Sequence, residues 1–221
     1  MLHKTRAIVL KSIKYGDSGL IVHIYTEYFG RQSLMVHGVR KKKSKFSYHF
    51  FEPLSLLNLD IYYKETRELQ TIKEVKSDTV LHHLLSDVRK SSIAIFISEI
   101  LYRCLREIES NKGLFDYLYH TVQVLDLTDK GLENFHIIFL IQLSKFLGIY
   151  PKNNTELINY KFIGNYQLND LFEFSLQDIG NIKIERTIRH DILENLISYY
   201  RNHLEGMGEI KSLQVLHEVY L

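Results

Sequence analysis

Short apolar runs separated by turn residues fill the first third of the chain. The breaks contain Gly, Asp and charged residues, as in "GDSG" and "FGR", and no long helical pattern lies between them. Runs rich in β-branched and aromatic residues and bounded in this way are typical of strands. Five strands are predicted, at residues 5–15, 20–28, 32–39, 50–63 and 67–75. Pro53 lacks a backbone donor, so it is expected at a strand start or edge. Five strands without a crossover helix predict a compact barrel of the OB or SH3-like kind.

After residue 79 the hydrophobic period changes to that of helices. A single stripe with helical spacing runs through Ile93, Phe96, Ile97, Ile100, Leu101, Cys104, Leu105 and Ile108. Further helices are predicted at residues 112–126, 131–149 and 187–204, with a short one near 212–219. Residues 152–186 are irregular, with β-like runs at 159–168 and 180–186.

The predicted fold class is therefore α+β. A small five-stranded β-barrel of the OB type occupies residues 1–79 and is expected to bind nucleic acid. A mostly α-helical domain with an irregular β-like insertion at about 152–186 occupies residues 80–221.

Charge is distributed unevenly between these two parts. The 221 residues have a net charge of +2, but residues 1–80 carry 14 Lys and Arg against 8 Asp and Glu, a net of +6. Over half of this excess lies in "GVRKKKSKF", between the third and fourth predicted strands. A concentrated positive field attracts polyanions, with nucleic acid and anionic membrane as the main candidates. A solvated loop that only aids solubility is the alternative reading of this run.

Several other classes of protein are disfavoured. The longest apolar runs are far shorter than the roughly 18–20 residues that span a membrane, and the N-terminus lacks a secretory signal pattern, so a cytoplasmic protein without a membrane partner is expected. Cys104 is the only cysteine, which excludes an internal disulfide or a thiolate zinc site within the chain. It lies on the apolar stripe as an expected buried thiol. With no catalytic or phosphate-loop motif matched, we expect neither an enzyme nor a cofactor, and no metal.

The candidate DNA contacts are cations of the barrel and one aromatic residue. The basic run provides Arg40, Lys41, Lys42, Lys43 and Lys45. Three cations on nearby strand ends are added, and so is Arg67, which is expected near the first loop at 15–19 in an OB arrangement. Tyr48 is the aromatic residue expected to be exposed for base stacking, whereas Tyr15 is expected to be partly buried. The three strand-end cations are Lys11, Lys14 and Arg31.

The order and spacing of further residues resemble the RecO family of bacterial recombination mediators. The matching features are "AIVL" at 7–10, "YGD" at 15–17, "FGR" at 29–31, "GVR" at 38–40 and "FEP" at 51–53, followed by "LG" at 147–148 with Pro151 and "KSL" at 211–213. The resemblance implies binding of single- and double-stranded DNA, annealing of complementary strands and cooperation with RecR. It also implies contact with the acidic C-terminal tail of single-strand binding protein and help in loading the RecA recombinase. Some relatives bind zinc through four cysteines after the position of Pro151; this chain lacks them.

Two other functions stay open at this stage. The chain is an interaction adaptor if its helical domain offers an apolar groove, rimmed for example by Arg103 and Arg106, to an acidic peptide. It is an RNA-associated OB protein if it prefers structured RNA to single-stranded DNA.

Overall fold

The computed structural model describes residues 1–41, 44–106, 109–151 and 168–220. The chain forms two compact units. The first comprises residues 1–82 and 98–122, and the second comprises residues 83–97 and 123–221. Two helices, α1 (Val88–Cys104) and α2 (Lys112–Leu127), therefore contribute residues to both units.

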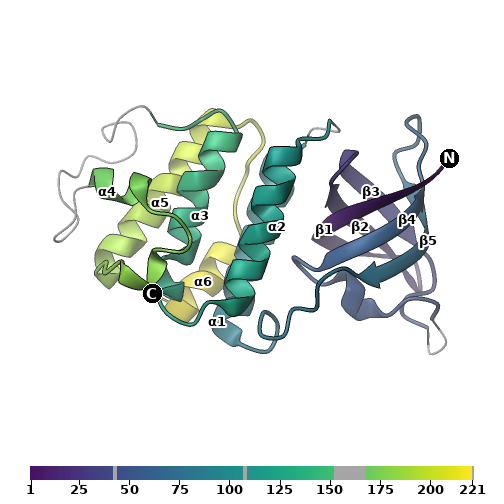
Figure 1. The fold of residues 1–221 in the computed structure, drawn as a ribbon, viewed down its shortest axis with the longest axis horizontal. Coiled ribbons are helices and arrows are strands. Elements are labelled where there is room, and N and C mark those ends of the chain that lie inside the picture. The colour runs from purple at the N-terminus through teal and green to yellow at the C-terminus, as the bar shows by residue number, and fades with distance from the viewer. Residues whose placement is uncertain (42–43, 107–108, 152–167, 221) are drawn as a thin grey trace. The chain divides into compact units, whose positions relative to one another are not determined.

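Five strands of the first unit close into a barrel in the order β1-β2-β3-β5-β4 (Figure 1). β3 and β5 are parallel, and the other neighbouring strands are antiparallel. This closed five-stranded arrangement is the predicted OB type. The strands are β1 (Leu2–Tyr15), β2 (Gly19–Thr26), β3 (Gly30–Val36), β4 (Leu56–Tyr62) and β5 (Gln70–Ser77).

The long first strand determines which turns lie together. Its first half pairs with β4, where Leu2 is opposite Tyr62, and its second half pairs with β2, where Tyr15 is opposite Gly19. A register irregularity between the two halves follows Val9, as expected where a strand bends to close a barrel. The β4–β5 turn and the β1–β2 turn therefore lie at opposite ends of β1.

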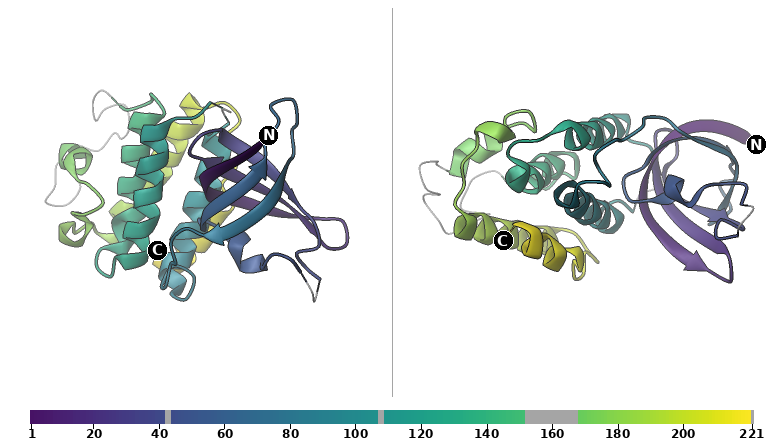
Figure 2. Two further views of the ribbon diagram at one scale, coloured as in Figure 1. Left: turned by 45° about the vertical axis from the view of Figure 1, so that its right-hand side comes forward. Right: turned by 90° about the horizontal axis from the view of Figure 1, so that it is seen from below.

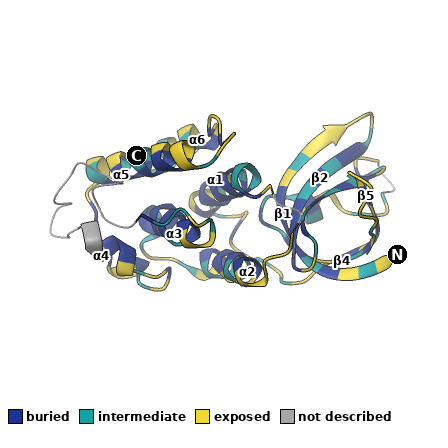
Figure 3. Ribbon diagram, turned by 90° about the horizontal axis from the view of Figure 1, so that it is seen from above, coloured by how far each residue is buried: buried dark blue, intermediate teal, exposed yellow. Residues whose placement is uncertain are grey.

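The fourth predicted strand is only half right. Residues 48–51 form the short 3-10 helix η1 (Tyr48–Phe51), and β4 begins at Leu56. Phe51 is 1% exposed in the barrel core, and the Leu54 N–H donates to the Val9 carbonyl at 2.9 Å. The apolar residues before β4 are thus buried without being in a strand. Figure 3 shows buried positions interspersed with intermediate and exposed ones along the strands.

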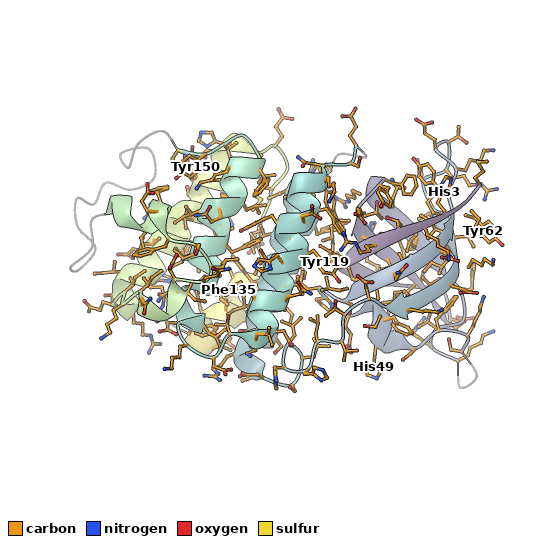
Figure 4. All side chains as sticks on the ribbon, in the orientation of Figure 1. His3, His49, Tyr62, Tyr119, Phe135 and Tyr150 are labelled. Carbon is orange, nitrogen blue, oxygen red and sulfur yellow. The ribbon has the colours of Figure 1, made fainter. Side chains whose placement is uncertain are left out.

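Parts of α1 (Val88–Cys104) and α2 (Lys112–Leu127) pack against the barrel within the first unit. Phe115 of α2 stacks on Tyr25 with ring centroids 6.4 Å apart. Tyr119, labelled in Figure 4, lies under the guanidinium of Arg6 at 4.9 Å. The boundary predicted between residues 79 and 80 falls in the β5–α1 connection, but residues 98–122 return to the barrel. We keep that boundary as a proposal.

The second unit is built around α3 (Leu132–Phe146), which is buried along most of its length. Among the described residues, α3 contacts α4 (Leu168–Glu173), η3 (Ile179–Asn181) and α5 (Arg186–His203), and α6 (Ser212–Tyr220) ends the described chain (Figure 2). The Tyr200 hydroxyl of α5 donates to the Leu140 carbonyl of α3. The helices predicted from the period after residue 79 are all present, although α1 ends at Cys104, before Leu105, and Ile108 of the predicted stripe lies outside the described residues.

The β-like insertion is not confirmed in the part that is described. The run at 159–168 lies outside the described residues, apart from the start of α4. The run at 180–186 is not a strand: η3 ends at Asn181 and α5 begins at Arg186. Ile182 and Ile184 are 3% and 8% exposed, and the Asn134 side chain donates to the Ile182 carbonyl at 2.9 Å. The alternating apolar pattern of this run therefore reflects a short extended segment whose isoleucines are buried. Among the described residues, the segment has no strand partner.

Candidate nucleic-acid interface

The basic segment, residues 38–45, leaves the barrel at the end of β3. Gly38 turns the chain with a φ of 70°, a conformation that favours glycine. The next residue, Val39, is 5% exposed and is part of the barrel core. This buried side chain fixes the start of the segment, so that the next two cations, Arg40 and Lys41, leave the barrel from a defined place.

Arg40 joins the basic segment to the β1–β2 turn. Its backbone N–H donates to the Ser18 carbonyl at 3.2 Å, and its Nη2 donates to the Gly16 carbonyl at 2.6 Å. Arg40 is itself exposed. Since a guanidinium has five N–H donors, one bond to a carbonyl orients the group and leaves its charge unneutralised.

Lys45 is held in a similar way at the other end of the segment. Its Nζ donates to the Lys73 carbonyl of β5 at 2.8 Å and lies 5.0 Å from the centre of the Phe46 ring. Lys41 is exposed. Among the described residues, no ion pair joins Arg40, Lys41 or Lys45 to a carboxylate. Lys42 and Lys43 lie outside the described residues.

A shallow hollow of about 430 Å³ lies between the basic segment and the β1–β2 turn. Its lining includes Tyr15, Asp17, His37 and Lys41. Tyr15 is 54% exposed, which corrects the expectation of a partly buried ring: it is the last residue of β1, beyond the end of the core. His37 was not predicted, although its place between the end of β3 and the basic run marks it for this surface.

The next three predicted contacts lie at three different places on the barrel. Lys14 is exposed one residue before Tyr15, on the same turn. Tyr48 is 42% exposed in η1, as expected. Arg67 is exposed in the β4–β5 turn, next to the N-terminus, where the Met1 amino group donates to the Tyr63 carbonyl at 3.0 Å. The expectation that Arg67 lies near the first loop is wrong, because the two turns are at opposite ends of β1.

Arg31 is held by the end of α1. Its Nη1 donates to the carbonyls of Tyr102 and Leu105 at 2.9 and 2.7 Å, and its guanidinium lies 4.5 Å from the centre of the Tyr102 ring. These carbonyls are at the C-terminus of the helix, where a cation is favoured by the helix dipole. In this structure Arg31 attaches α1 to β3, and its contact with DNA stays a prediction.

Lys11 shares the same aromatic ring. Its Nζ lies 4.4 Å from the centre of the Tyr102 ring, although the side chain is exposed on β1. His23 of β2 also contacts Tyr102, and burial, followed by the charges of Arg31 and Lys11, lowers the pKa of His23 to about 4. His23 is therefore neutral at pH 7, so the charge around Tyr102 comes from Arg31 and Lys11.

The remaining chemistry predicted for the chain is limited. Burial raises the pKa of the Cys104 thiol to about 12, so the thiolate that would act as a nucleophile is scarce. No helix among the described residues is long and apolar enough to cross a membrane.

The fold defines the class of the protein as an OB-barrel protein with an attached helical region. Two family models match the chain: "Recombination protein O N terminal" over residues 1–79 and "Recombination protein O C terminal" over residues 85–161. The chain is 37% identical to the DNA repair protein RecO of Azobacteroides pseudotrichonymphae and 37% identical to that of Phocaeicola vulgatus, with all of each chain covered. It is 35% identical to that of Bacteroides fragilis, again over the full length of both. The chain belongs to the RecO family, a family of DNA repair and recombination.

Proposed function

We propose that this protein is a DNA-binding recombination mediator that anneals complementary single strands. Its binding surface, named the turn surface, consists of the basic segment with Lys14, Tyr15 and Tyr48. The observation that carries the proposal is that the described cations of the segment contact neutral groups, carbonyl oxygens or a ring. A carbonyl orients a cation without cancelling its charge, so the positive field remains available to phosphates.

Annealing follows from charge neutralisation. Two complementary strands repel each other through their phosphates, and a protein that neutralises several phosphates lowers this barrier and concentrates both strands. Exposed Tyr15 and Tyr48 add stacking faces, each of which contributes about 1–3 kcal/mol per base without reading sequence. The same surface accepts double-stranded DNA through its phosphates.

We further propose that the protein helps to load the recombinase RecA onto DNA coated by single-strand binding protein, together with RecR. Support comes from the family, whose relatives are named DNA repair proteins. A loading assay with coated single strands tests this step: recombinase filaments should form faster with the protein and RecR present. An unchanged rate would remove the loading role and leave binding and annealing in place.

The DNA proposal is tested by the salt dependence of binding to the intact protein. Five phosphate contacts predict a slope of log K against log salt of roughly −3.5 for single strands. Replacing Lys41, Lys42 and Lys43 by Ala should flatten the slope by about 2 and slow strand annealing for all sequences alike. An unchanged slope would remove the basic segment from the surface.

A matched control removes the same charge from the other end of the barrel. Lys4, Lys64 and Arg67 are exposed there, and their replacement by Ala should leave the slope near that of the wild type. Equal flattening by both triple variants would show that overall charge, rather than the turn surface, attracts DNA. This control also tests Arg67, which was predicted as a contact.

An adaptor function is the second candidate, and one cleft favours it. In the second unit a cleft of about 480 Å³ is lined by two cations, Arg201 and Lys211, two carboxylates, Glu194 and Glu209, and apolar side chains that include Ile210 and Leu213. The cations and the apolar side chains are the groups that an acidic peptide tail requires, while the carboxylates reduce the positive charge of the cleft. By contrast, Arg103 lies 3.8 Å from Glu99 as an ion pair. Titration of a labelled acidic-tail peptide against the intact chain and Lys211→Glu tests this: equal affinity for both would exclude the cleft.

The RNA-associated alternative is distinguished in the same binding assay. Competition by structured RNA that is stronger than competition by single-stranded DNA would favour it. The intact chain is needed in all these assays, because a cut at residue 80 would remove residues 98–122 from the barrel unit.

A further inference from the structure

Two histidines and one glutamate meet between α5 and α6. His190 and Glu194 are one turn apart on α5, and His217 is on α6. One ligand atom from each of the three residues lies within 4.8 Å of the others. The His217 Nε2 and Glu194 Oε1 atoms are 3.6 Å apart, and the centroids of the two imidazole rings are 4.6 Å apart. Residues four apart on a helix face the same side, so α5 presents both of its ligands to α6.

One nitrogen atom of this cluster is buried and lacks a hydrogen-bond partner among the described residues. The atom is Nε2 of His217. A buried polar atom in a native protein normally has a partner, and a metal ion would supply one here.

We propose that His190, Glu194 and His217 form a binding site for a divalent transition metal of the Zn²⁺ type. Two imidazoles and one carboxylate are a donor set that suits zinc, which takes three protein ligands and leaves a fourth position open in many sites. Bonds of about 2.0–2.2 Å in a tetrahedral site separate ligand atoms by roughly 3.3–3.6 Å. The pair of His217 and Glu194 already has this separation, and small side-chain rotations bring in His190.

The fourth position faces solvent. Glu194 and His217 line the same cleft as Arg201 and Lys211, so water or a small anion completes the coordination. The two cations lower the affinity for a bare metal ion and favour an anionic fourth ligand. The site differs in residues and in place from a cysteine quartet after Pro151, for which this chain has no cysteines.

A metal at this site would fasten α6 to α5. α6 is also attached by its buried Leu216 and through Tyr220, whose carbonyl accepts from Arg189 of α5 at 3.1 Å and whose hydroxyl donates to the Arg89 carbonyl of α1 at 2.9 Å. Because a ligand that binds only the folded state stabilises it, zinc is expected to raise the thermal midpoint of the protein. This inference does not depend on the DNA-binding proposal.

The experiment titrates Zn²⁺ into the metal-free intact protein in competition with a chromophoric chelator, and repeats the titration with Co²⁺. We expect one ion per chain, a rise in thermal midpoint with zinc, and the intense visible absorption of four-coordinate cobalt. His190→Ala and His217→Ala should each weaken zinc binding by at least about 100-fold, more than the loss of an outer partner of a ligand. Both variants should also abolish the zinc-dependent rise in thermal midpoint.

Two further variants keep the result decisive. Glu194→Gln preserves the size of the side chain and should weaken zinc binding even if a histidine variant folds poorly. His49→Ala is the matched control, because His49 is an exposed histidine whose Nδ1 lies 3.1 Å from a single carboxylate, that of Glu52. Absence of zinc binding by the wild type, or the same affinity in Glu194→Gln and His49→Ala, would overturn the proposal.

Discussion

Replacing Arg31 by Ala distinguishes a structural cation from a DNA contact. The side chain makes two charge-assisted hydrogen bonds, at 2.9 and 2.7 Å, to carbonyls at the end of α1, and it stacks on Tyr102. Hydrogen bonds to charged groups contribute about 1.5–3 kcal/mol each, and an exposed cation–π contact about 0.5–1 kcal/mol. Arg31 is half-buried, so solvent screening reduces the sum. We expect the free energy of unfolding to fall by about 2–4 kcal/mol.

Two comparison variants separate the contributions to this loss. Arg31→Lys keeps the charge over the ring but cannot bond both carbonyls through a planar fork, so about half of the loss should remain. Lys11→Ala removes the other cation over Tyr102, at 4.4 Å, and should cost about 0.5–1 kcal/mol.

The assay combines urea unfolding, followed by circular dichroism, with the salt slope of single-strand binding. Arg31→Ala should lower the unfolding midpoint and leave the slope unchanged. If the variant instead unfolds at the wild-type urea concentration and flattens the slope by about 0.7, Arg31 is a phosphate contact and the structural reading is wrong.

Two further predictions concern the second unit. Gly131 has a φ of 75°, and a Cβ there would lie 2.2 Å from the Ile179 carbonyl oxygen. Gly131→Ala should therefore destabilise the protein by about 2–4 kcal/mol in thermal unfolding. Gly148 has a φ of 70° but no atom within 4 Å of an added Cβ, so Gly148→Ala should cost about 1 kcal/mol in the same measurement. Equal losses would show that backbone strain alone matters. Burial and the charge of Arg189 lower the pKa of His136 from 6.5 to about 3. Below pH 6.5 the unfolded chain therefore takes up a proton at this histidine and the folded protein does not. The free energy of unfolding consequently falls as the pH is lowered from 6.5 toward 3. His136→Phe should reduce this loss by about 2–3 kcal/mol near pH 4.5 in urea titrations, and an unchanged pH profile would contradict the assignment.

Secondary structure was largely predictable because periodicity reports burial directly. The stripe along α1 and the alternation along β2 both follow from which side chains leave water. Two predictions failed for the same reason. Phe51 and Ile182 are both buried. Phe51 is in a 3-10 helix and Ile182 is in extended backbone, and neither is paired with a strand of the barrel. An apolar pattern gives the burial of a short segment without giving its backbone partners.

The candidate site was predictable only in part, because two residues of the same type and charge can have different partners in the folded protein. Arg31 and Arg40 are the same residue type in the same barrel. The first is fixed by α1, 71 residues away along the chain, whereas the second bonds to the turn that precedes β2. A place for Arg40 close to the β1–β2 turn is accessible from sequence, because both belong to one small barrel. The contact between Arg31 and the end of α1 is not, because no residue near "FGR" indicates that a distant helix covers this arginine.

The difference between these two arginines sets what each can do for DNA. Arg31 has its guanidinium between helix carbonyls and an aromatic ring, and moving it to a phosphate would free the end of α1 at the cost of those contacts. Arg40 has one carbonyl partner and an exposed side chain, so a phosphate can approach without any rearrangement of the barrel. Under the proposed function, binding of a phosphate at Arg40 would therefore break no contact that holds the fold together. This favours the turn surface over the cations around Tyr102, Lys11 and Arg31, as the proposed place for a phosphate chain.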